Sequence, residues 1–231
     1  MAREEFDKEL SILESDLVVM SGMVEDALLR SVKALKNRDV DQSQRVIELD
    51  DRIDLREVEI ERSCVDLIRK EAPIASDLRR IITILQISNE LERMGDYAEG
   101  IGKINIMMGP GPLLKELIDI PEMGNIAVEM LKRAINIFIK KEEENLNEIA
   151  TEINELDNKV DSLNEKIVSE LLEIVKNDSS KAEKATYLMW ASHNIERFAD
   201  RSTNILERGF YLVSGDSFHG STDLQEHIDN E

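Results

Sequence analysis

The chain has 231 residues, of which 42% are hydrophobic and 34% charged, so it can bury a core and is not disordered by composition. Its 49 acidic residues outnumber 29 basic ones, giving a net charge of -20, which excludes nucleic acid as an expected partner because phosphate backbones are also negative. Aromatic residues make up only 4%, which argues against β-sandwiches and barrels. The single cysteine, Cys64, excludes an internal disulfide, and no apolar segment is long enough for a signal peptide or a membrane span. We therefore expect a soluble, cytoplasmic protein.

Proline marks the joints between the predicted helices. The prolines stand at Pro73, Pro110, Pro112 and Pro121, and the long stretches without proline are rich in Glu, Leu, Lys, Ile and Ala, which favours helices. From Ile149 onward, apolar residues recur every three or four positions, which predicts one buried stripe on a long helix. Six helices are expected, at about 3–36, 39–71, 74–108, 121–141, 143–176 and 180–213.

The two halves of the chain repeat each other. Residues 89–96 align with 193–200, and residues 48–54 align with 155–161. Because short connections place consecutive helices side by side, each half is expected to be a three-helix bundle. The predicted fold is all-α, with six long helices forming two tandem homologous three-helix bundles. The expected divisions are a first bundle at 1–108, a linker at 109–120, a second bundle at 121–213 and a polar tail at 214–231.

Four segments have the form acid-x-x-x-Asp, and a spacing of four places both carboxylates on one face of a helix. The pairs are Asp50 and Asp54, Glu92 and Asp96, Asp157 and Asp161, and Glu196 and Asp200. They lie beside or along the apolar stripes, where like charges repel and buried carboxylates lose hydration, so a bound cation would offset the cost. Oxygen-rich clusters suit magnesium, manganese or iron, and zinc less well because His and Cys are scarce. The acidic pairs are therefore predicted metal ligands.

The residues that flank the acidic pairs also allow an interpretation without metal. Arg93 and Arg197 recur beside the motifs and can neutralise the acids as ion pairs, in a contact between helices that is purely structural. His193 lies three residues before Glu196 and is an additional candidate ligand, although a lone histidine is more often a hydrogen-bonded surface residue. Small residues, Gly95 and Ala199, precede the motif aspartates and allow a close approach by a helix or by ions.

No catalytic constellation is present in the sequence. It contains no phosphate-binding P-loop, no G-x-S-x-G and no H-E-x-x-H motif, and the absence of Glu-x-x-His weighs against a ferritin-like di-iron oxidase. We therefore predict a protein without enzymatic activity. Two other classes compete with a regulator: a carboxylate-bridged metalloenzyme, and a helical adaptor that binds no metal.

With the repeat in view, the sequence resembles the PhoU family, the accessory and regulatory proteins of the phosphate-specific ABC transporter. The resemblance covers about residues 4–215 and is carried by residues 46–54, 75–79 and 90–96, and in the second half by 195–200, 203–205 and 211–215. It implies two homologous three-helix bundles whose acidic motifs bind multinuclear clusters of divalent or trivalent metal ions. This chain departs from the family pattern at Tyr97 and Arg201, where His often follows the motif Asp.

The resemblance also implies partners. It predicts a non-enzymatic regulator that restrains phosphate uptake by acting on the ATPase subunit of the transporter and, in bacteria, on a sensor histidine kinase. A second copy of the chain, in a homodimer, is a further candidate partner. Because the chain and an anionic membrane are both negative, we expect membrane association only through a protein partner.

Overall fold

The structure is a computed structural model that describes residues 2–109, 111–141 and 146–215. Within these residues it consists of long α-helices, with a short 3-10 turn before the last one. The helices are α1 (Ala2–Asn37), α2 (Val40–Glu71), α3 (Ala75–Met107), α4 (Asp119–Lys140), α5 (Leu146–Asn177) and α6 (Ala182–Ser214), and the turn is η1 (Ser179–Lys181). No strand occurs in this part of the chain, so the all-α prediction is confirmed.

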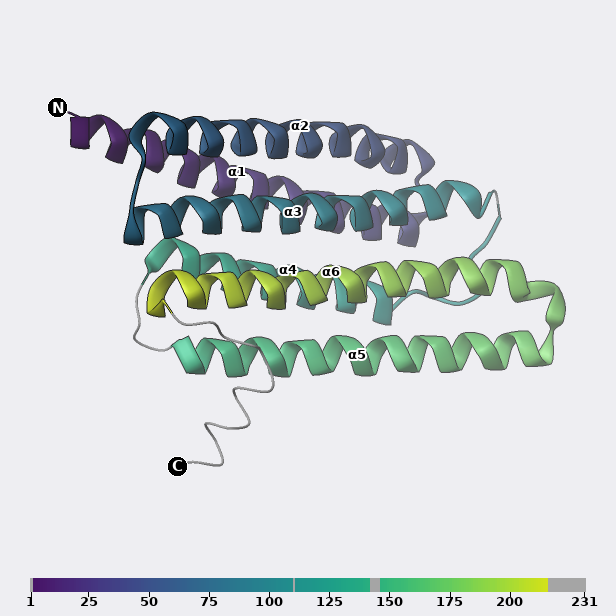
Figure 1. The fold of residues 1–231 in the computed structure, drawn as a ribbon. Helices are drawn as coiled ribbons and strands as arrows, with labels where there is room; N and C mark the ends of the chain where they lie inside the picture. Colours follow the sequence, from purple (N-terminus) through teal and green to yellow (C-terminus); the bar gives the residue numbers. More distant parts are fainter. Residues whose placement is uncertain (1, 110, 142–145, 216–231) are drawn as a thin grey trace, which may run out of the picture.

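The helices form two layers (Figure 1). In the front layer α2, α3, α6 and α5 lie side by side in that order, and α1 and α4 lie behind them. Helices α1, α2 and α3 pack together as one bundle, and α4, α5 and α6 pack together as the other. These are the two tandem three-helix bundles that the sequence predicts. They meet where α3 packs on α6 and α1 on α4.

Local sequence chemistry explains several helix ends. Asp39 caps α2 by accepting a hydrogen bond from the backbone N–H of Gln42 at 2.9 Å, and Asp178 caps η1 by accepting one from Ser180 at 3.1 Å. Helix α4 begins at Asp119, two residues before Pro121, where we expected the helix to start. Proline fits there because the first turn of a helix leaves its N–H groups without an intrahelical acceptor.

The predicted apolar stripes form the core. On α5, Ile153, Val160, Ile167 and Leu171 are buried, and the intervening stripe residues are partly buried against them. On α2 the buried residues include Val46, Ile53, Ile60, Cys64 and Leu67. Each stripe faces the third helix of its own bundle, so the acidic motifs beside the stripes lie at the edges of the α2–α3 and α5–α6 seams.

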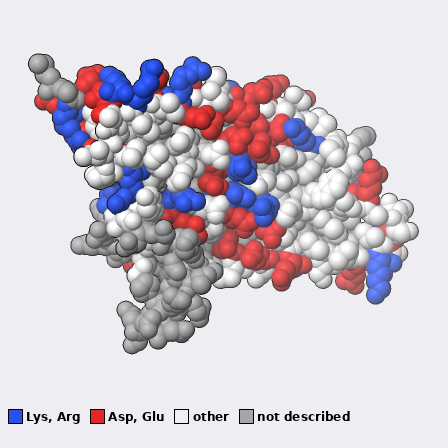
Figure 2. Space-filling view, in the orientation of Figure 1, with Lys and Arg blue, Asp and Glu red and all other residues white. Residues whose placement is uncertain are grey.

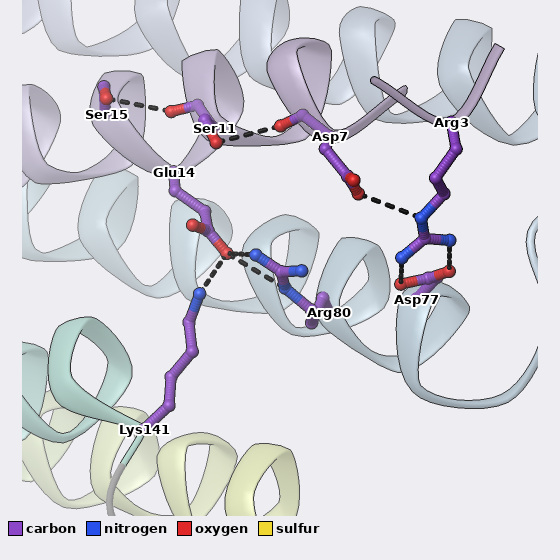
Figure 3. A network of polar contacts seen from close by, with 8 residues as sticks. All are labelled: Arg3, Asp7, Ser11, Glu14, Ser15, Asp77, Arg80 and Lys141. Atoms are coloured by element: carbon purple, nitrogen blue, oxygen red, sulfur yellow. Dashed lines mark hydrogen bonds and ion pairs between the residues drawn. The ribbon is translucent and has the colours of Figure 1, made fainter. Parts of the chain in front are cut away.

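Polar contacts also join the two halves. Glu14 of α1 accepts hydrogen bonds from Arg80 of α3 and is paired with Lys141, the residue that follows α4, at 2.5 Å (Figure 3). A second contact lies between α3 and α6, where Arg201 pairs with Glu90 at 3.4 Å and Asn204 donates to the same carboxylate at 3.2 Å. These contacts, with the apolar packing, fix the position of one seam relative to the other.

Two further expectations concern segments of the chain rather than the bundles. Among the described residues, no helix is both long enough and apolar enough to cross a membrane. The predicted polar tail begins at 214, but α6 continues to Ser214 and Gly215 ends it in the left-handed conformation. Residues 216–231 of that tail lie outside the described residues.

Candidate metal centres

The contact between α2 and α3, which we call the first seam, brings three carboxylates together. Asp50 of α2 and Asp96 and Glu99 of α3 each offer an oxygen, and these oxygens lie within 4.8 Å of one another. A separation of this size allows one cation to be bound by all three groups. Two of them, Asp50 and Asp96, are predicted ligands, whereas Glu99 is not.

Asp50 is the most enclosed acid of this seam. It is only 7% exposed, and its Oδ1 atom has no hydrogen-bond partner among the described residues. A Cβ atom added to Gly95 would lie 2.9 Å from this oxygen, so the glycine makes the room that the carboxylate occupies. Burial, and then the charges of Asp54, Glu99 and Asp96, raise the pKa of Asp50 to about 7, with Lys103 opposing the rise.

The other predicted ligands of the first half lie along the same seam. Asp54 is exposed and Glu92 is half-buried, and neither belongs to the close group of three. Burial is the main cause that raises the pKa of each, and the charge of Asp96 raises both further. All the first-half acids therefore act on one another electrostatically and would share the charge of bound cations.

The contact between α5 and α6, which we call the second seam, repeats this arrangement with acids that lie farther apart. Asp157 is the counterpart of Asp50, and its Oδ1 atom is likewise buried without a hydrogen-bond partner among the described residues. Burial, and then Asp161, Asp200 and Glu196, raise the pKa of Asp157 to about 6. In the described part of the chain, no three acids of this seam approach as closely as the group around Asp50.

Positive side chains enter the second seam. Arg197 pairs with Asp200 at 3.3 Å, so the ion-paired interpretation describes part of this seam. His193 is exposed, and its Nδ1 atom lies 2.8 Å from an oxygen of Glu196, which places the imidazole at the rim beside one predicted ligand. Burial raises the pKa of Asp200, while Arg197, Arg201 and His193 oppose the rise.

The two departures from the family pattern meet each other across the bundles. The guanidinium of Arg201 on α6 pairs with Glu90 of α3 at 3.4 Å, and Tyr97 of α3 lies near the same group. The guanidinium is therefore bound to groups of the first half. These side chains contribute to the contact between the bundles.

Figure 2 shows how the charges are distributed on this face of the molecule. Red acidic side chains gather in two patches, one over α2 and α3 and the other over α5 and α6, with blue basic side chains between them. The two seams thus open on the same face, and a partner that covers this face would contact both.

Glu99 is the residue of this site that the sequence motifs do not include. Both members of each motif pair recur as acids in the other half, and this recurrence identifies the motifs. Glu99 does not recur, because its counterpart is Thr203. One signal was available: Glu99 follows Asp96 by three residues, so both lie on the same face of α3.

The chemistry of these groups fits hard cations. Carboxylate oxygens are the ligands that magnesium, manganese and iron accept, and a buried carboxylate oxygen without a donor is destabilising unless a cation or water satisfies it. Asp50, a member of the first group, carries such an unpartnered oxygen. The neighbouring acids would supply the remaining oxygen ligands.

Comparison with known proteins identifies the family. The PhoU domain model matches residues 17–104 and again 120–209. The phosphate-specific transport system accessory protein PhoU of Edwardsiella tarda is 33% identical over 96% of this chain and 90% of its own length. The PhoU homolog of Clostridium acetobutylicum is 36% identical over 93% of this chain and 97% of its own length.

Solved structures agree with these matches. The crystal structure of PhoU from Pseudomonas aeruginosa superposes with a TM-score of 0.84 at 30% identity, covering 91% of this chain and all of the other. The phosphate transport system regulatory protein PhoU from Streptococcus pneumoniae gives a TM-score of 0.82 at 28% identity, over 93% of this chain and 99% of the other. The chain belongs to the PhoU family.

Proposed function

We propose that this chain is a non-enzymatic regulator of phosphate uptake that negatively modulates a phosphate-specific ABC transporter. Its relatives are named as accessory proteins of the phosphate-specific transport system, and they align over nearly the whole chain. The protein works in the cytoplasm, where it meets the ATPase subunit of the transporter. A sensor histidine kinase is a second partner, through which the same protein influences phosphate signalling.

Metal ions form part of this proposal. The observation that carries it is the close group of Asp50, Asp96 and Glu99, in which the buried Oδ1 atom of Asp50 has no hydrogen-bond partner among the described residues. Multinuclear clusters of iron, manganese or magnesium would occupy both seams. The eight motif acids supply most of their ligands, and His193 is an additional candidate at the rim of the second seam.

Bound cations would also change the docking surface. The chain carries a net charge of -20, and both seams open on the face shown in Figure 2. A cation inverts the local field of a carboxylate cluster, so metal ions reduce repulsion toward an acidic partner and supply contacts of their own. Membrane association then depends on the transporter, or on a dimer of this chain docked to it, and not on lipid.

Metal content tests the first part of the proposal. Converting Asp50, Asp54, Glu92 and Asp96 to the corresponding amides should abolish metal at the first seam and leave the second seam loaded, as measured by elemental analysis. Glu48→Gln is the matched control, because Glu48 is an exposed acid of the same helix away from the seam. Unchanged metal content in the combined variant would contradict the proposed ligands.

Capture by the ATPase subunit tests the second part. The purified subunit should retain the wild-type chain, and a chelator should weaken that retention. Retention that is indifferent to the chelator would favour the adaptor that needs no metal. Turnover of phosphoesters, peroxide or dioxygen by the metal-loaded chain would favour the metalloenzyme. Absence of retention under both conditions, or binding to protein-free anionic liposomes, would contradict the regulator.

A further inference from the structure

The two seams differ in the carboxylates that reach them. In the first seam, Glu99 places an oxygen within 4.8 Å of oxygens of Asp50 and Asp96. The corresponding residue of the second seam is Thr203, whose hydroxyl donates to the backbone carbonyl of Asp200 at 2.7 Å. The second seam therefore lacks a carboxylate at this position, and the hydroxyl found there is bonded to its own helix.

The group around Glu99 contains an oxygen that lacks a partner. Asp50 is 93% buried, being only 7% exposed, and its Oδ1 atom accepts no hydrogen bond from any described residue. That oxygen lies where a Cβ atom of Gly95 would come within 2.9 Å, so it is directed toward α3, the helix that carries Asp96 and Glu99. A buried and unpartnered carboxylate oxygen, on an acid grouped with two further carboxylates, indicates a cation ligand.

A cationic side chain already lies at this seam. The Nζ atom of Lys103 pairs with an oxygen of Glu99 at 2.5 Å, and the lysine side chain is 55% exposed. A long, exposed lysine side chain can move its ammonium group into water when a metal ion takes its place. Lys103 is therefore a removable competitor for Glu99, which is released as a ligand when the lysine moves away.

Two arginine side chains act on the second seam. Arg197 pairs with Asp200 at 3.3 Å, and its side chain is 43% exposed. Arg201 follows directly, is only 17% exposed, and is fixed by Glu90 across the α3–α6 contact at 3.4 Å. Its counterpart in the first half is the neutral Tyr97. The charge of Arg201 opposes the rise in the pKa of Asp200, so it reaches the second seam and would repel a metal ion bound there.

We propose that Glu99 is a metal ligand particular to the first seam and that the two seams load in order, the first at lower metal concentration than the second. The inference rests on the proposed function, which places metal at both seams. It adds an unequal affinity, caused by Glu99 in one seam and by Arg201 and Thr203 in the other. A chain of this kind would respond to metal in two steps.

The affinity of each seam for manganese(II) tests this inference. The first seam is measured in the full chain carrying Asp157→Asn with Asp200→Asn, and the second in the full chain carrying Asp50→Asn with Asp96→Asn. Equilibrium dialysis against manganese(II), with elemental analysis, gives the Kd of each seam, and circular dichroism checks that each variant is folded. We expect the Kd of the first seam to be lower by about 10-fold or more, since loss of even an outer-shell partner costs about 10-fold in metal affinity.

Two variants on these backgrounds identify the cause. Glu99→Gln should raise the Kd of the first seam by about 10-fold, and Thr203→Glu should lower the Kd of the second, while Glu48→Gln changes neither. Equal Kd values, or a change below about twofold in Glu99→Gln, would overturn this inference and leave metal binding at both seams intact. Manganese bound at neither seam would contradict both this inference and the metal part of the proposed function.

Discussion

The two seams share one geometry and differ in charge. Each places an aspartate of the second helix of its bundle against an acid pair of the third helix, and Asp50 and Asp157 both keep a buried oxygen without a partner among the described residues. Around this common frame, carboxylates of the first seam are replaced in the second by neutral groups, Glu57 by Asn164 and Glu99 by Thr203. The repeat therefore preserves the backbone positions of the site while the electrostatic field at those positions differs.

The difference extends to the packing under each site. Gly95 leaves room for Asp50 in the first seam, whereas Ala199 fills the corresponding position in the second. Ile53 packs against Gly95, and its counterpart on α5 is the smaller Val160. The first seam thus combines a larger apolar residue on α2 with a smaller residue on α3. Mutations at equivalent positions can show how far the two halves differ.

The largest expected effect is on core packing. Ile53→Ala should lower the free energy of unfolding by about 2–5 kcal/mol, because Ile53 is fully buried between α2 and α3 and its removal leaves a cavity. Val160→Ala should cost about 1 kcal/mol less, since one methylene fewer is removed. Urea unfolding measures both, with the exposed Glu48→Gln as the control. A larger loss in Val160→Ala would show that the second seam is the more tightly packed.

The next effect is the pH dependence of stability without metal. The pKa of Asp50 is raised from its ordinary value of 3.8 to about 7, so the folded chain holds a proton that the unfolded chain releases. Because the folded state binds more protons, the free energy of unfolding should fall as pH rises from about 4 to about 7 and level off above that. For Asp157 the fall should end near pH 6, the value to which its pKa is raised.

Amide variants separate the contributions of Asp50 and Asp157 to the pH dependence of stability. In the presence of a chelator at pH 8, Asp50→Asn should raise the free energy of unfolding by about 1–3 kcal/mol, because the amide removes a buried charge and its repulsion by the neighbouring acids, and Asp157→Asn by less. Unfolding in urea at pH 4.5 and at pH 8 provides the measurement. A wild-type chain that grows more stable over this pH range would show that Asp50 is ionised and satisfied in the folded state.

A smaller effect follows from exchanging the small residues. Gly95→Ala should lower the free energy of unfolding by about 1 kcal/mol, because the new Cβ atom would lie 2.9 Å from Asp50 Oδ1 and 3.1 Å from Ile53 Cγ2, outweighing the better helix propensity of alanine. It should also weaken manganese(II) binding at the first seam by displacing the Asp50 carboxylate. Ala199→Gly should cost about 1–2 kcal/mol, through lower helix propensity and the loss of a buried methyl group, and leave metal binding unchanged. Identical metal affinities in Gly95→Ala and wild type would contradict the assigned role of this glycine.

Periodicity and repetition made most of the fold predictable. The apolar stripe that contains Ile153 and Val160 indicated α5, and the alignment of the motif acids indicated two equivalent bundles, because both patterns depend only on helix geometry. Glu99 escaped the same reasoning because a repeat reveals only what both halves share. Glu99 matters because α2 approaches α3 and brings Asp50 next to it. The sequence does not specify this approach.

The start of α4 shows a second limit. Proline predicts a helix boundary, yet Pro121 lies within the first turn of α4, where the missing N–H is not needed. The contact between Glu90 and Arg201 was also beyond reach, since it depends on how one bundle packs on the other. Patterns along one chain segment predict helices and their faces, whereas contacts between bundles need the tertiary arrangement.

The smallest expected effect compares the residues that end the first helix of each bundle. Arg38 after α1 and Lys141 after α4 both adopt the left-handed conformation, with φ of 57° and 53°, where glycine is less strained. Arg38 donates to the side chain of Asn105 and the backbone of Gly109, so Arg38→Gly should lower the free energy of unfolding by about 1 kcal/mol despite the relief of strain.

Lys141 contacts only the partly exposed Glu14 among the polar groups described (Figure 3), and such pairs contribute about 0–1 kcal/mol. Relief of strain and loss of the pair should nearly cancel in Lys141→Gly, giving a change in unfolding free energy of about 0.5 kcal/mol or less. Thermal unfolding of the two variants side by side measures this difference, and a loss in Lys141→Gly as large as that in Arg38→Gly would show that the Glu14 contact holds the two halves together.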